Sequence, residues 1–398
     1  MIKGKQILLG VTGGIAAYKA VELLRLLKKA GTDVHVVMTD AAQHFVGKTT
    51  FEVLSENPVI TNLWKDTGSS VAHIDVASRT HGAVIAPATA NCIGKLAHGI
   101  ADDALTTTFL AVTSPILICP SMNTDMYQNI RVQKNLDILE QDGIHILDPD
   151  AGVLACKTVG TGRLPEPWFI LDRITAMLSP KNLKGKRLLI SAGPTQEAID
   201  PVRYISNHSS GKMGYAVAQA AERRGGEVTL VSGPVQVEPP PGVKYVPVQS
   251  CDQMAKAMLD ELPLADIIIK VAAVSDFKPV HPEELKIKKK PGQNGLTLSM
   301  TENTDILRKI GELKSNKQFL VGFAAETHDL DIHARSKMEK KNLDMIVANM
   351  VGQEGSGFQS DTNKVKIFLK DGQVLDIPLM EKIQVAETLL DTISDQLG

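Results

Sequence analysis

The chain has 398 residues, of which 43% are hydrophobic and 22% are charged, so it has room for two or three globular domains of roughly 150 residues each. Lys and Arg number 43 and Asp and Glu number 45, which gives a net charge of -2. This balance argues against a dedicated nucleic-acid-binding protein, which is normally basic, and an aromatic content of 4% provides few stacking platforms for single strands.

Cysteine usage and hydropathy predict a cytoplasmic protein. The 4 cysteines form neither a C-x-x-C pair nor a zinc-type cluster with His, so a disulfide framework is not expected and a reducing compartment fits best. No apolar run reaches the roughly 18 residues of a membrane-spanning helix, so no membrane partner is expected. The short run Ile7–Val11 is predicted to be a buried strand and not a signal peptide.

Two segments of the chain begin in nearly the same way. Residues 3–14 and 184–195 each combine a Lys-Gly-Lys start, a short apolar run and a glycine-containing turn. The first strand of an open α/β sheet usually begins like this. Because Leu178–Asn182 has linker composition, we predict two domains, residues 1–180 and 184–398.

Apolar strand patterns alternate with amphipathic helical patterns in both halves, which predicts an α/β fold of two open, mostly parallel, doubly wound sheets. Asp371-Gly372 between two apolar runs predicts a C-terminal hairpin, followed by a helix over 383–393. Other predicted helices are 16–29, 213–224, 252–262 and 332–341. Strands are predicted at 7–11, 34–38, 83–86, 116–119, 145–147, 228–231, 267–271, 319–323 and 345–348.

A glycine-rich turn joins the first strand to the first helix. Gly13 and Gly14 would let the backbone approach a phosphate, and the helix N-terminus supplies N–H groups. The full G-x-G-x-x-G pattern is absent, so a single phosphate, as on FMN, suits the turn better than a pyrophosphate. A tight turn without a ligand is an equally common use of such a motif.

Polar residues also follow later strands. Thr89 and Asn91 come after the strand at 83–86, and Asn123 comes after the strand at 116–119. Ligands of open α/β sheets bind at these strand ends, but Thr and Asn are also favoured helix N-caps. For Asn123 taken alone, capping is the better interpretation.

Two isolated residues are candidates for a catalytic role. Cys156 lies in a glycine-punctuated loop that could close over a substrate, and its thiol would be protonated near neutral pH and able to donate a proton. An isolated Cys is more often a small buried apolar residue, and a lone His such as His73 is more often structural.

In order along residues 3–178, these motifs resemble the FMN-dependent cysteine decarboxylases, whose housekeeping member acts on phosphopantothenoylcysteine. The resemblance is carried by residues 13–19, 73–75, 87–91, 120–126 and 154–156. It implies a flavodoxin-like half in which His73 acts at the flavin, Asn123 grips the substrate carboxylate and Cys156 donates a proton. It also implies that FMN is held by Gly13, Gly14, Thr39, Thr89 and Asn91.

The implied chemistry gives the flavin a clear purpose. A carboxylate β to a plain thiol has no electron sink, but oxidation of the thiol to a thioaldehyde lets the carbanion left by CO2 loss become an enethiolate. Lys157 departs from the family pattern, because a neighbouring ammonium would lower the pKa of the Cys156 thiol or could bind the substrate phosphate.

The second half contains a loop of small polar residues before its first helix. Gly211 and Gly214 in this loop, residues 199–214, predict an anion-binding turn. A Walker A motif is excluded, because its upstream Gly and following Ser or Thr are missing. The basic run 286–292 and the pair Lys337 and Lys341 would by themselves be solvated faces.

Residues 187–395 resemble phosphopantothenate–cysteine ligase, on the loop above and on residues 272–277, 285–289, 322–327 and 341–344. Both halves together resemble the bacterial bifunctional enzymes of coenzyme A synthesis. The resemblance implies a Rossmann-like ligase half that uses CTP and Mg2+ to couple 4′-phosphopantothenate to cysteine through an acyl-cytidylate. The product, 4′-phosphopantothenoylcysteine, would then be decarboxylated to 4′-phosphopantetheine.

The same resemblance implies roles for residues of the ligase half. Asn207 would stabilise the acyl-cytidylate step, Lys286 would meet the CTP phosphates, and Asp276 would contact the nucleotide and Mg2+. The other implied CTP-binding residues are Lys270, Val271, Ala272, Thr304, Asp305, Ile306, Leu307, Phe323, Lys337 and Lys341.

Two other hypotheses are weighed against this one. A nicotinamide oxidoreductase with two α/β domains is disfavoured by the missing G-x-G-x-x-G. A flavoprotein-like regulatory subunit without catalysis would lack Asn123 or Cys156, and both are present. The favoured hypothesis also implies a homo-oligomer with trimeric flavoprotein contacts and dimeric ligase contacts, which together would build a dodecamer.

Overall fold

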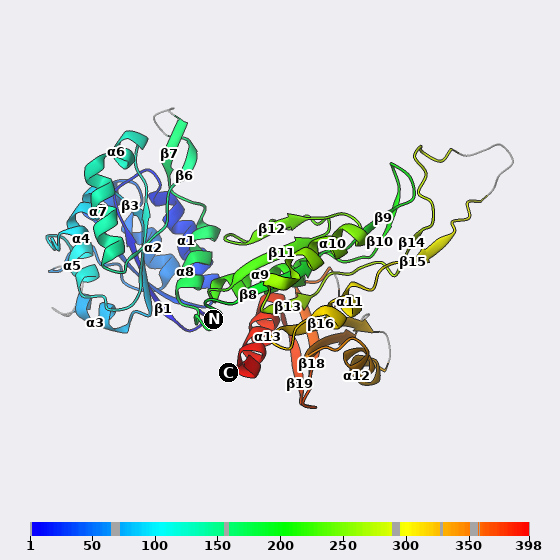
Figure 1. Cartoon of the computed structure of the whole chain (residues 1–398). Helices are drawn as coiled ribbons and strands as arrows, with labels where there is room; N and C mark the ends of the chain where they lie inside the picture. The colour runs from blue at the N-terminus through cyan, green and yellow to red at the C-terminus, as the bar shows by residue number, and fades with distance from the viewer. Residues whose placement is uncertain are drawn as a thin grey trace. The chain divides into compact units, whose positions relative to one another are not determined.

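The computed structural model describes residues 2–64, 72–154, 159–288, 295–326, 329–350, 357 and 359–397. The chain divides between Ser179 and Pro180 into two compact units, called unit 1 and unit 2 here (Figure 1). Each unit is described by itself.

Unit 1 is built on a parallel sheet with the strand order β2-β1-β3-β4-β5 among its described residues, and β6 pairs with β7 in a separate antiparallel hairpin. Its elements are β1 (Gln6–Val11), α1 (Ala17–Lys29), β2 (Asp33–Met38), η1 (Asp40–His44), α2 (Lys48–Ser55), α3 (Ala72–Arg79), β3 (Gly82–Ala88), α4 (Ala90–Ala97), α5 (Ala104–Leu110), β4 (Ile116–Pro120), α6 (Thr124–Gln128), α7 (Ile130–Gln141), β5 (His145–Ile146), β6 (Asp150–Val153), β7 (Val159–Arg163) and α8 (Pro167–Met177).

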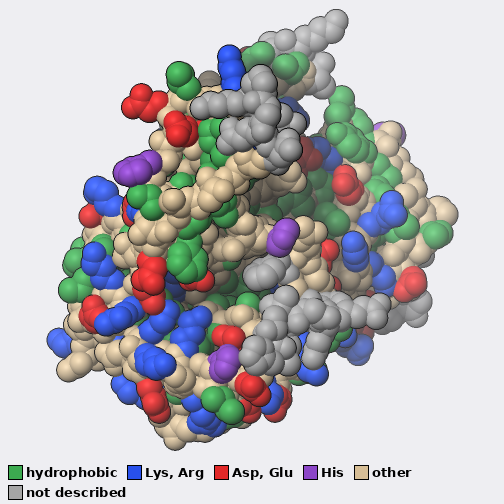
Figure 2. Space-filling model, turned by 90° about the vertical axis from the view of Figure 1, so that its right-hand side faces the viewer, with side chains coloured by type: hydrophobic (Ala, Val, Ile, Leu, Met, Phe, Trp, Pro, Cys, Tyr) green, Lys and Arg blue, Asp and Glu red, His purple; other side chains and the backbone are tan. Residues whose placement is uncertain are grey.

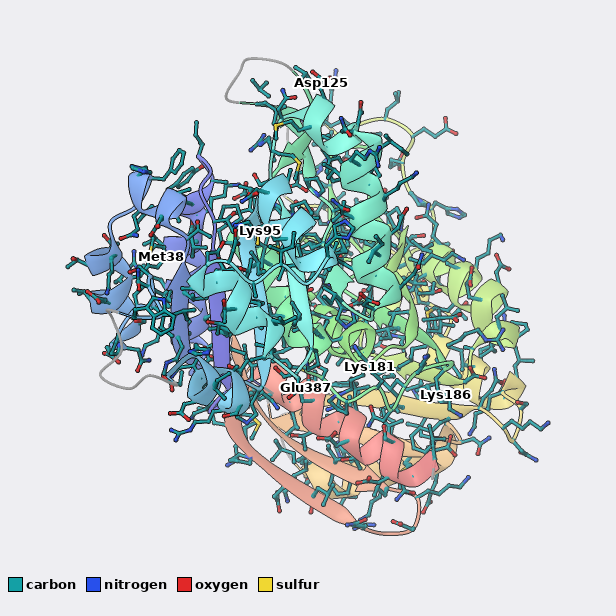
Figure 3. The ribbon with its side chains drawn as sticks, turned by 90° about the vertical axis from the view of Figure 1, so that its left-hand side faces the viewer. Met38, Lys95, Asp125, Lys181, Lys186 and Glu387 are labelled. Atoms are coloured by element: carbon teal, nitrogen blue, oxygen red, sulfur yellow. The ribbon has the colours of Figure 1, made fainter. Side chains whose placement is uncertain are left out.

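Both faces of this sheet are covered, because side chains alternate along each strand. On β1, Ile7 and Leu9 join one buried cluster with residues of α1 and α8, and Leu8 joins another with residues of α4, α5 and α7. Lys95, labelled in Figure 3, pairs from α4 with Asp102 and Asp103 and so fastens the start of α5. The near-continuous apolar strands follow from this two-sided burial.

Unit 2 contains a larger sheet with the order β12-β11-β8-β13-β16-β17-β18-β19. Its elements are β8 (Arg187–Ala192), β9 (Gln196–Ala198), β10 (Tyr204–Ser206), α9 (Lys212–Arg223), β11 (Glu227–Ser232), β12 (Lys244–Pro247), α10 (Cys251–Glu261), η2 (Leu262–Leu264), β13 (Ile267–Lys270), β14 (Phe277–Pro279), β15 (Met300–Glu302), α11 (Ile306–Leu313), β16 (Phe319–Glu326), α12 (Leu330–Lys340), β17 (Met345–Met350), β18 (Thr362–Leu369), β19 (Val374–Glu381) and α13 (Lys382–Leu397).

The strands from β12 to β17 are parallel, and β17, β18 and β19 pair antiparallel. The short pairs β9–β10 and β14–β15 lie on segments that extend past the edge of this sheet in Figure 1. The predicted pair of open α/β sheets is therefore confirmed, and so is the C-terminal hairpin at Asp371-Gly372. The two short pairs were not predicted, because strands of 3 residues have no measurable periodicity.

One face of the unit 2 sheet is held by α9 and α13. Arg224, which follows α9 and is only 2% exposed, donates hydrogen bonds to Glu387 Oε2 and Asp391 Oδ1 of α13, both at 2.6 Å. Glu387 is labelled on α13 in Figure 3. Because a buried guanidinium needs charged partners, this contact specifies how the last helix packs against α9.

No helix in the described part of the chain combines the length and apolarity needed to cross a bilayer.

Close packing between α9 and β8 gives a stability prediction. A Cβ atom on Gly214 would lie 2.6 Å from the Cβ atom of Ala192 and 3.1 Å from its Cα atom. Ala is normally favoured over Gly inside a helix by up to about 1 kcal/mol, but here the strand would have to move. We expect Gly214→Ala to lower the free energy of unfolding by about 1–2 kcal/mol, measured by urea denaturation of the full chain.

Gly295→Ala is the matched control, because no atom lies within 4 Å of a Cβ atom built there. Equal stability of the two variants would contradict the close-packing argument.

Candidate functional sites

In each unit the strand order reverses near the middle of the sheet. The chain places β2 on one side of β1 and β3 on the other, and it places β11 on one side of β8 and β13 on the other. Loops that leave the carboxyl ends of two such strands diverge and open a crevice, the usual ligand site of open α/β sheets. The predicted site residues can therefore be located relative to these two crevices.

In unit 1 the turn after β1 and the turn after β3 are joined directly. Thr12 Oγ1 donates a hydrogen bond to the Pro87 carbonyl oxygen at 2.7 Å and accepts one from the Thr89 backbone N–H at 3.0 Å. The predicted residues Gly13, Gly14 and Thr89 are thus brought together at one crevice.

Gly13 and Gly14 are required for different reasons. A Cβ atom on Gly13 would lie 2.5 Å from the Cβ atom of Ala41, so this glycine allows η1 to pack closely. A Cβ atom on Gly14 would make only an ordinary van der Waals contact with the Thr89 methyl group, at 3.9 Å, so the backbone of Gly14 is otherwise uncovered on that side. This uncovered backbone beside the start of α1 fits a group that approaches the backbone closely, such as a phosphate.

The other predicted cofactor residues occupy helix starts at the same edge. The Thr39 side chain accepts a hydrogen bond from Ala42 N at the start of η1, and the Thr89 side chain accepts one from Cys92 N at the start of α4. Asn91 is exposed in the first turn of α4. The capping interpretation is therefore correct for Thr89, and Thr39 caps η1 in the same way, so capping fixes both positions at the crevice.

Asn123 caps α6, with its Oδ1 atom accepting from Asp125 N at 2.9 Å. The β6–β7 hairpin is fixed beside it, because Met122 N donates to the Gly162 carbonyl oxygen at 3.0 Å. Figure 1 shows the hairpin next to α6, and Asp125 is labelled at the start of that helix in Figure 3. Cys156 lies between β6 and β7, outside the described residues.

His73 lies in the first turn of α3, where its side chain is half-buried. The helix α3 packs against α5 and β1. Unit 1 thus joins the turns that carry Gly13, Gly14 and Thr89 by hydrogen bonds, and it places His73 on a separate helix.

In unit 2 a cavity of about 400 Å³ opens at the crevice between β8 and β13. It contains every residue predicted to bind CTP except Lys286, together with Asn207. The predicted residues in its lining are Asn207, Lys270, Val271, Ala272, Asp276, Thr304, Asp305, Ile306, Leu307, Phe323, Lys337 and Lys341.

Three lysines converge on one wall of this cavity. Lys270 ends β13 and donates to the Ala272 carbonyl oxygen at 2.9 Å, Lys337 lies within 3.4 Å of the Phe323 carbonyl oxygen, and Lys341 pairs with Asp305 at 2.8 Å. Burial, and after it the charge of the neighbouring Lys337, lower the pKa of Lys270 to about 7. The pKa of Lys337 is also lowered, first by burial and then by Lys341.

Asp305, Asp276 and Glu326 act on Lys337, yet the pKa values of Lys270 and Lys337 stay lowered, so this wall is short of negative charge. An anion in the cavity would relieve that shortage.

The centre of the cavity is cross-linked by two asparagines. Asn207 Nδ2 donates to the Ala273 carbonyl oxygen at 3.0 Å, which holds the segment after β10 against the segment after β13. Asn303 N donates to the Asp276 carbonyl oxygen at 2.8 Å, which holds the turn before α11 against the same segment. Asn207 and Asp276 are both exposed and both line the cavity.

The described residues contain no group of three or more His, Cys, Asp or Glu side chains with metal-binding geometry. Mg2+ typically takes one or two carboxylates and completes its octahedral shell with substrate phosphates and water. Asp276 with nucleotide phosphates fits that pattern.

Lys286 lies outside the cavity lining and is exposed. Its neighbour Ile287 is tied to the β9–β10 connection, because Ile287 N donates to Asp200 Oδ2 and Arg203 donates to the Ile287 carbonyl oxygen. The structure therefore does not bring Lys286 to the other predicted nucleotide residues.

Sequence analysis missed several residues of the cavity lining. The missed polar side chains are Ser209, Ser210, Lys212, Asn303, Asn349, Asn363 and Lys382. Lys212 stood in the predicted anion loop, so its spacing could have identified it. Asn363 and Lys382 come from the C-terminal hairpin and helix, and only the fold brings them to the cavity.

Figure 2 shows basic and acidic side chains intermingled on the face drawn. The concentration of lysines is therefore a property of the cavity lining and not of that face.

Two family models match the chain. One, described as DNA/pantothenate metabolism flavoprotein C-terminal domain, matches residues 183–397, and the other, described as Flavoprotein, matches residues 1–179. The chain is 48% identical over 399 residues to the coenzyme A biosynthesis bifunctional protein CoaBC of Bacillus subtilis (strain 168), covering 99% of this chain and 98% of that protein. It is 43% identical over 395 residues to the protein of the same name from Escherichia coli (strain K12), covering 98% and 97%.

Solved structures are similar to each half of the chain. A C-terminal domain of a coenzyme A biosynthesis bifunctional protein CoaBC has a TM-score of 0.47 and 42% identity, covering 55% of this chain and 98% of that one. A cysteine-to-serine variant of a PPC decarboxylase, in complex with pantothenoylaminoethenethiol, has a TM-score of 0.39 and 29% identity, covering 43% and 97%.

The buried lysine gives a pH prediction. The pKa of Lys270 is about 7 in the folded chain against 10.5 for an ordinary lysine, so between these pH values the unfolded chain binds a proton that the folded chain lacks. As pH rises through that window, the penalty for burying the Lys270 ammonium disappears, so the free energy of unfolding increases by at most about 1.4 kcal/mol per pH unit. Below pH 7 the whole penalty is present. Lys337, Lys341, Asp305 and Cys251 are the titratable neighbours that set this pKa.

We expect Lys270→Met to be more stable than the unchanged chain below pH 7, with the advantage shrinking toward pH 10. Urea denaturation across this pH range measures the difference. Lys364→Met, which changes an exposed lysine of β18, is the control and should show no such trend. A stability difference that is constant with pH would contradict the prediction.

Proposed function

The chain belongs to the family of coenzyme A biosynthesis bifunctional CoaBC proteins, and we propose that residues 1–180 decarboxylate phosphopantothenoylcysteine while residues 184–398 join phosphopantothenate to cysteine. The family confirms a bifunctional decarboxylase and ligase, as predicted from the sequence. The nicotinamide oxidoreductase and the noncatalytic subunit are thereby excluded. The observation that most supports the residue assignments is the convergence of the predicted nucleotide residues on one cavity of unit 2.

In the ligase reaction, the cationic wall formed by Lys270, Lys337 and Lys341 binds the nucleotide CTP, whose phosphates supply the missing negative charge. Asp276 would hold Mg2+, and the bound ion would supply positive charge that lowers the repulsion between the substrate carboxylate and the nucleotide phosphates. The carboxylate displaces pyrophosphate and forms the acyl-cytidylate. The cysteine amine then attacks the acyl carbon and releases CMP.

Asn207 is assigned to the acyl-cytidylate step. Its amide is fixed at the crevice by the 3.0 Å hydrogen bond to Ala273, so it meets a bound acyl group without reorganising. Lys286 is assigned to the CTP phosphates on the resemblance alone, since it is exposed outside the cavity lining.

In the decarboxylase reaction, the uncovered backbone of Gly14 and the neighbouring Thr89 would hold the phosphate of FMN, with Gly13, Thr39 and Asn91 as further contacts. Bound FMN would supply reversible two-electron oxidation of the substrate thiol. The flavoprotein family of residues 1–179 and the fit of this crevice to a monophosphate support the choice of FMN.

The remaining groups of the decarboxylase act on the substrate. Asn123, oriented by its bond to Asp125, binds the carboxylate that leaves as CO2. Cys156 donates the proton that the substrate carbon needs after CO2 loss, from a loop whose flanking strands are fixed beside Asn123. His73 is assigned to the flavin on the resemblance alone.

We infer a homo-oligomer with trimeric contacts through unit 1 and dimeric contacts through unit 2. Large apolar side chains are exposed at the start of α1, Ile15 at 62% and Tyr18 at 59%, and on the extended pairs of unit 2, where Tyr204 is 53% and Phe277 52% exposed. Large apolar side chains that are exposed in a single chain are typical of surfaces that become buried between subunits. Native mass spectrometry of the full chain tests the inferred stoichiometry.

The full reaction has a direct test. The chain, supplied with FMN, 4′-phosphopantothenate, cysteine, CTP and Mg2+, should form 4′-phosphopantetheine, detected by its mass. Omission of CTP should abolish the product, and supplied 4′-phosphopantothenoylcysteine should restore it. Product formation without CTP would contradict the assignment of unit 2.

The two half-reactions provide internal controls for single substitutions. Asn207→Asp should let the acyl-cytidylate accumulate while decarboxylation of supplied 4′-phosphopantothenoylcysteine continues at its normal rate. Cys156→Ser should stop at the oxidised enethiol while ligation continues. Chromatography with mass detection identifies the species, and normal turnover by either variant would refute its role.

A further inference from the structure

Unit 1 contains a tyrosine to which the proposed function gives no role. Tyr127 lies in the last turn of α6, and Asn123, assigned above to the substrate carboxylate, caps the other end of the same helix. The two residues are joined directly, because Tyr127 N donates to the Asn123 carbonyl oxygen at 2.9 Å. Contacts that fix Tyr127 therefore also fix the helix that carries Asn123.

Tyr127 is held by two polar contacts with other elements. Its hydroxyl donates to Asp148 Oδ1 at 3.0 Å, in the connection between β5 and β6, and its carbonyl oxygen accepts from Gln133 Nε2 of α7 at 2.6 Å. The half-buried ring packs against the apolar cluster under α4, α5 and α7. Burial, and after it the bond to Asp148, raise the pKa of Tyr127 to about 12, so the phenol stays protonated and can donate throughout the neutral range.

The bond to Asp148 closes a ring of contacts that begins and ends on β4. Leu147 N, next to Asp148, donates to the Ile118 carbonyl oxygen of β4 at 2.9 Å. From Ile118 the chain runs directly into Asn123 and then along α6 to Tyr127. Of the contacts that complete this ring, the bond from Tyr127 to Asp148 is made between side chains, so a substitution can remove it without changing the backbone.

The helix α6 depends on such contacts for its position. It has 5 residues, and none of them is fully buried. A helix of this length has little stability of its own, and hydrophobic packing alone fixes it weakly. A group that binds a substrate must nevertheless be held within about 0.5 Å of its working position. The polar contacts of Tyr127 supply this constraint at the end of α6 opposite Asn123.

We propose that Tyr127 and Asp148 are positioning residues of the decarboxylase, which hold α6 so that Asn123 meets the substrate carboxylate. This role rests on the proposed decarboxylase function of unit 1. Both residues act through Asn123 and not on the reacting atoms. Removal of the bond between them should therefore weaken recognition of the carboxylate and leave the rest of substrate binding unchanged.

The test uses the full chain loaded with FMN and two competitive inhibitors of the decarboxylation of 4′-phosphopantothenoylcysteine. 4′-Phosphopantothenoylserine keeps the carboxylate but carries a hydroxyl in place of the thiol, and 4′-phosphopantothenoylethanolamine lacks the carboxylate as well. In Tyr127→Phe, the inhibition constant of the serine compound should rise roughly 3- to 10-fold, as should the KM of the substrate. The inhibition constant of the ethanolamine compound should stay unchanged, which a general loosening of unit 1 would not produce.

Substitutions at Asp148 provide the matched variants. Asp148→Ala should repeat the effect of Tyr127→Phe, whereas Asp148→Asn keeps an acceptor oxygen and should recover most of the preference for the carboxylate. Because both residues act through one bond, the double variant Tyr127→Phe/Asp148→Ala should lose no more than either single variant. Asp137→Ala removes an exposed carboxylate from the neighbouring α7 and should leave both inhibition constants unchanged.

The fold of each variant is checked by its FMN content and by ligation in unit 2, both of which should be normal. Asp148 is exposed, so Asp148→Ala keeps the test open if Tyr127→Phe is unstable.

Three outcomes would overturn the positioning role: equal weakening of both inhibitors, additive losses in the double variant, or no change in either Tyr127→Phe or Asp148→Ala. Failure of the unchanged chain, loaded with FMN, to release CO2 from 4′-phosphopantothenoylcysteine would instead refute the proposed decarboxylase function, and the positioning role with it. Normal release by the unchanged chain together with unaltered variants would refute only the positioning role.

Discussion

The reversal of strand order at the centre of each sheet determines where both sites lie. In unit 1 the segments after β1 and β3 must diverge, and in unit 2 the same holds for those after β8 and β13. The two segments that leave the carboxyl ends of these strands pass over opposite faces of the sheet. A crevice therefore remains between them. Thr12 spans the crevice of unit 1 by hydrogen bonds, and Asn207 spans the crevice of unit 2. Each crevice is therefore held at a fixed width.

Buried ammonium groups give the unit 2 cavity its chemical selectivity. Lys270 is 8% exposed and has a second lysine, Lys337, as a neighbour. Holding such groups without a ligand costs stability, because burial disfavours the charged form. An anionic ligand reverses this cost, so the same contacts that weaken the empty fold strengthen binding. A neutral ligand gains nothing from them, which separates phosphorylated substrates from neutral analogues.

Sequence predicted the central strands and their helices well, because strands buried on both faces carry long apolar runs and the helices carry clear amphipathic patterns. The lysine wall of Lys270, Lys337 and Lys341 was reached only through family resemblance, since i,i+4 lysines by themselves indicate a solvated face. Lys382 gave no signal at all, because it lies 170 residues from Lys212 in the chain and is brought there by the packing of α13 on α9. Such long-range contacts depend on the whole fold and not on local pattern.

The helix caps of unit 1 show why structural and functional interpretations of one residue need not compete. The Asn123 side chain uses its oxygen to cap α6, and this bond fixes the direction of its amide nitrogen, the group that would donate to a carboxylate. Thr89 caps α4 with its side chain while its backbone N–H is held by Thr12. A residue that must hold a ligand precisely needs a fixed side chain, and a capping bond provides this without additional residues. Caps at the carboxyl edge of a parallel sheet are therefore well suited to become binding groups.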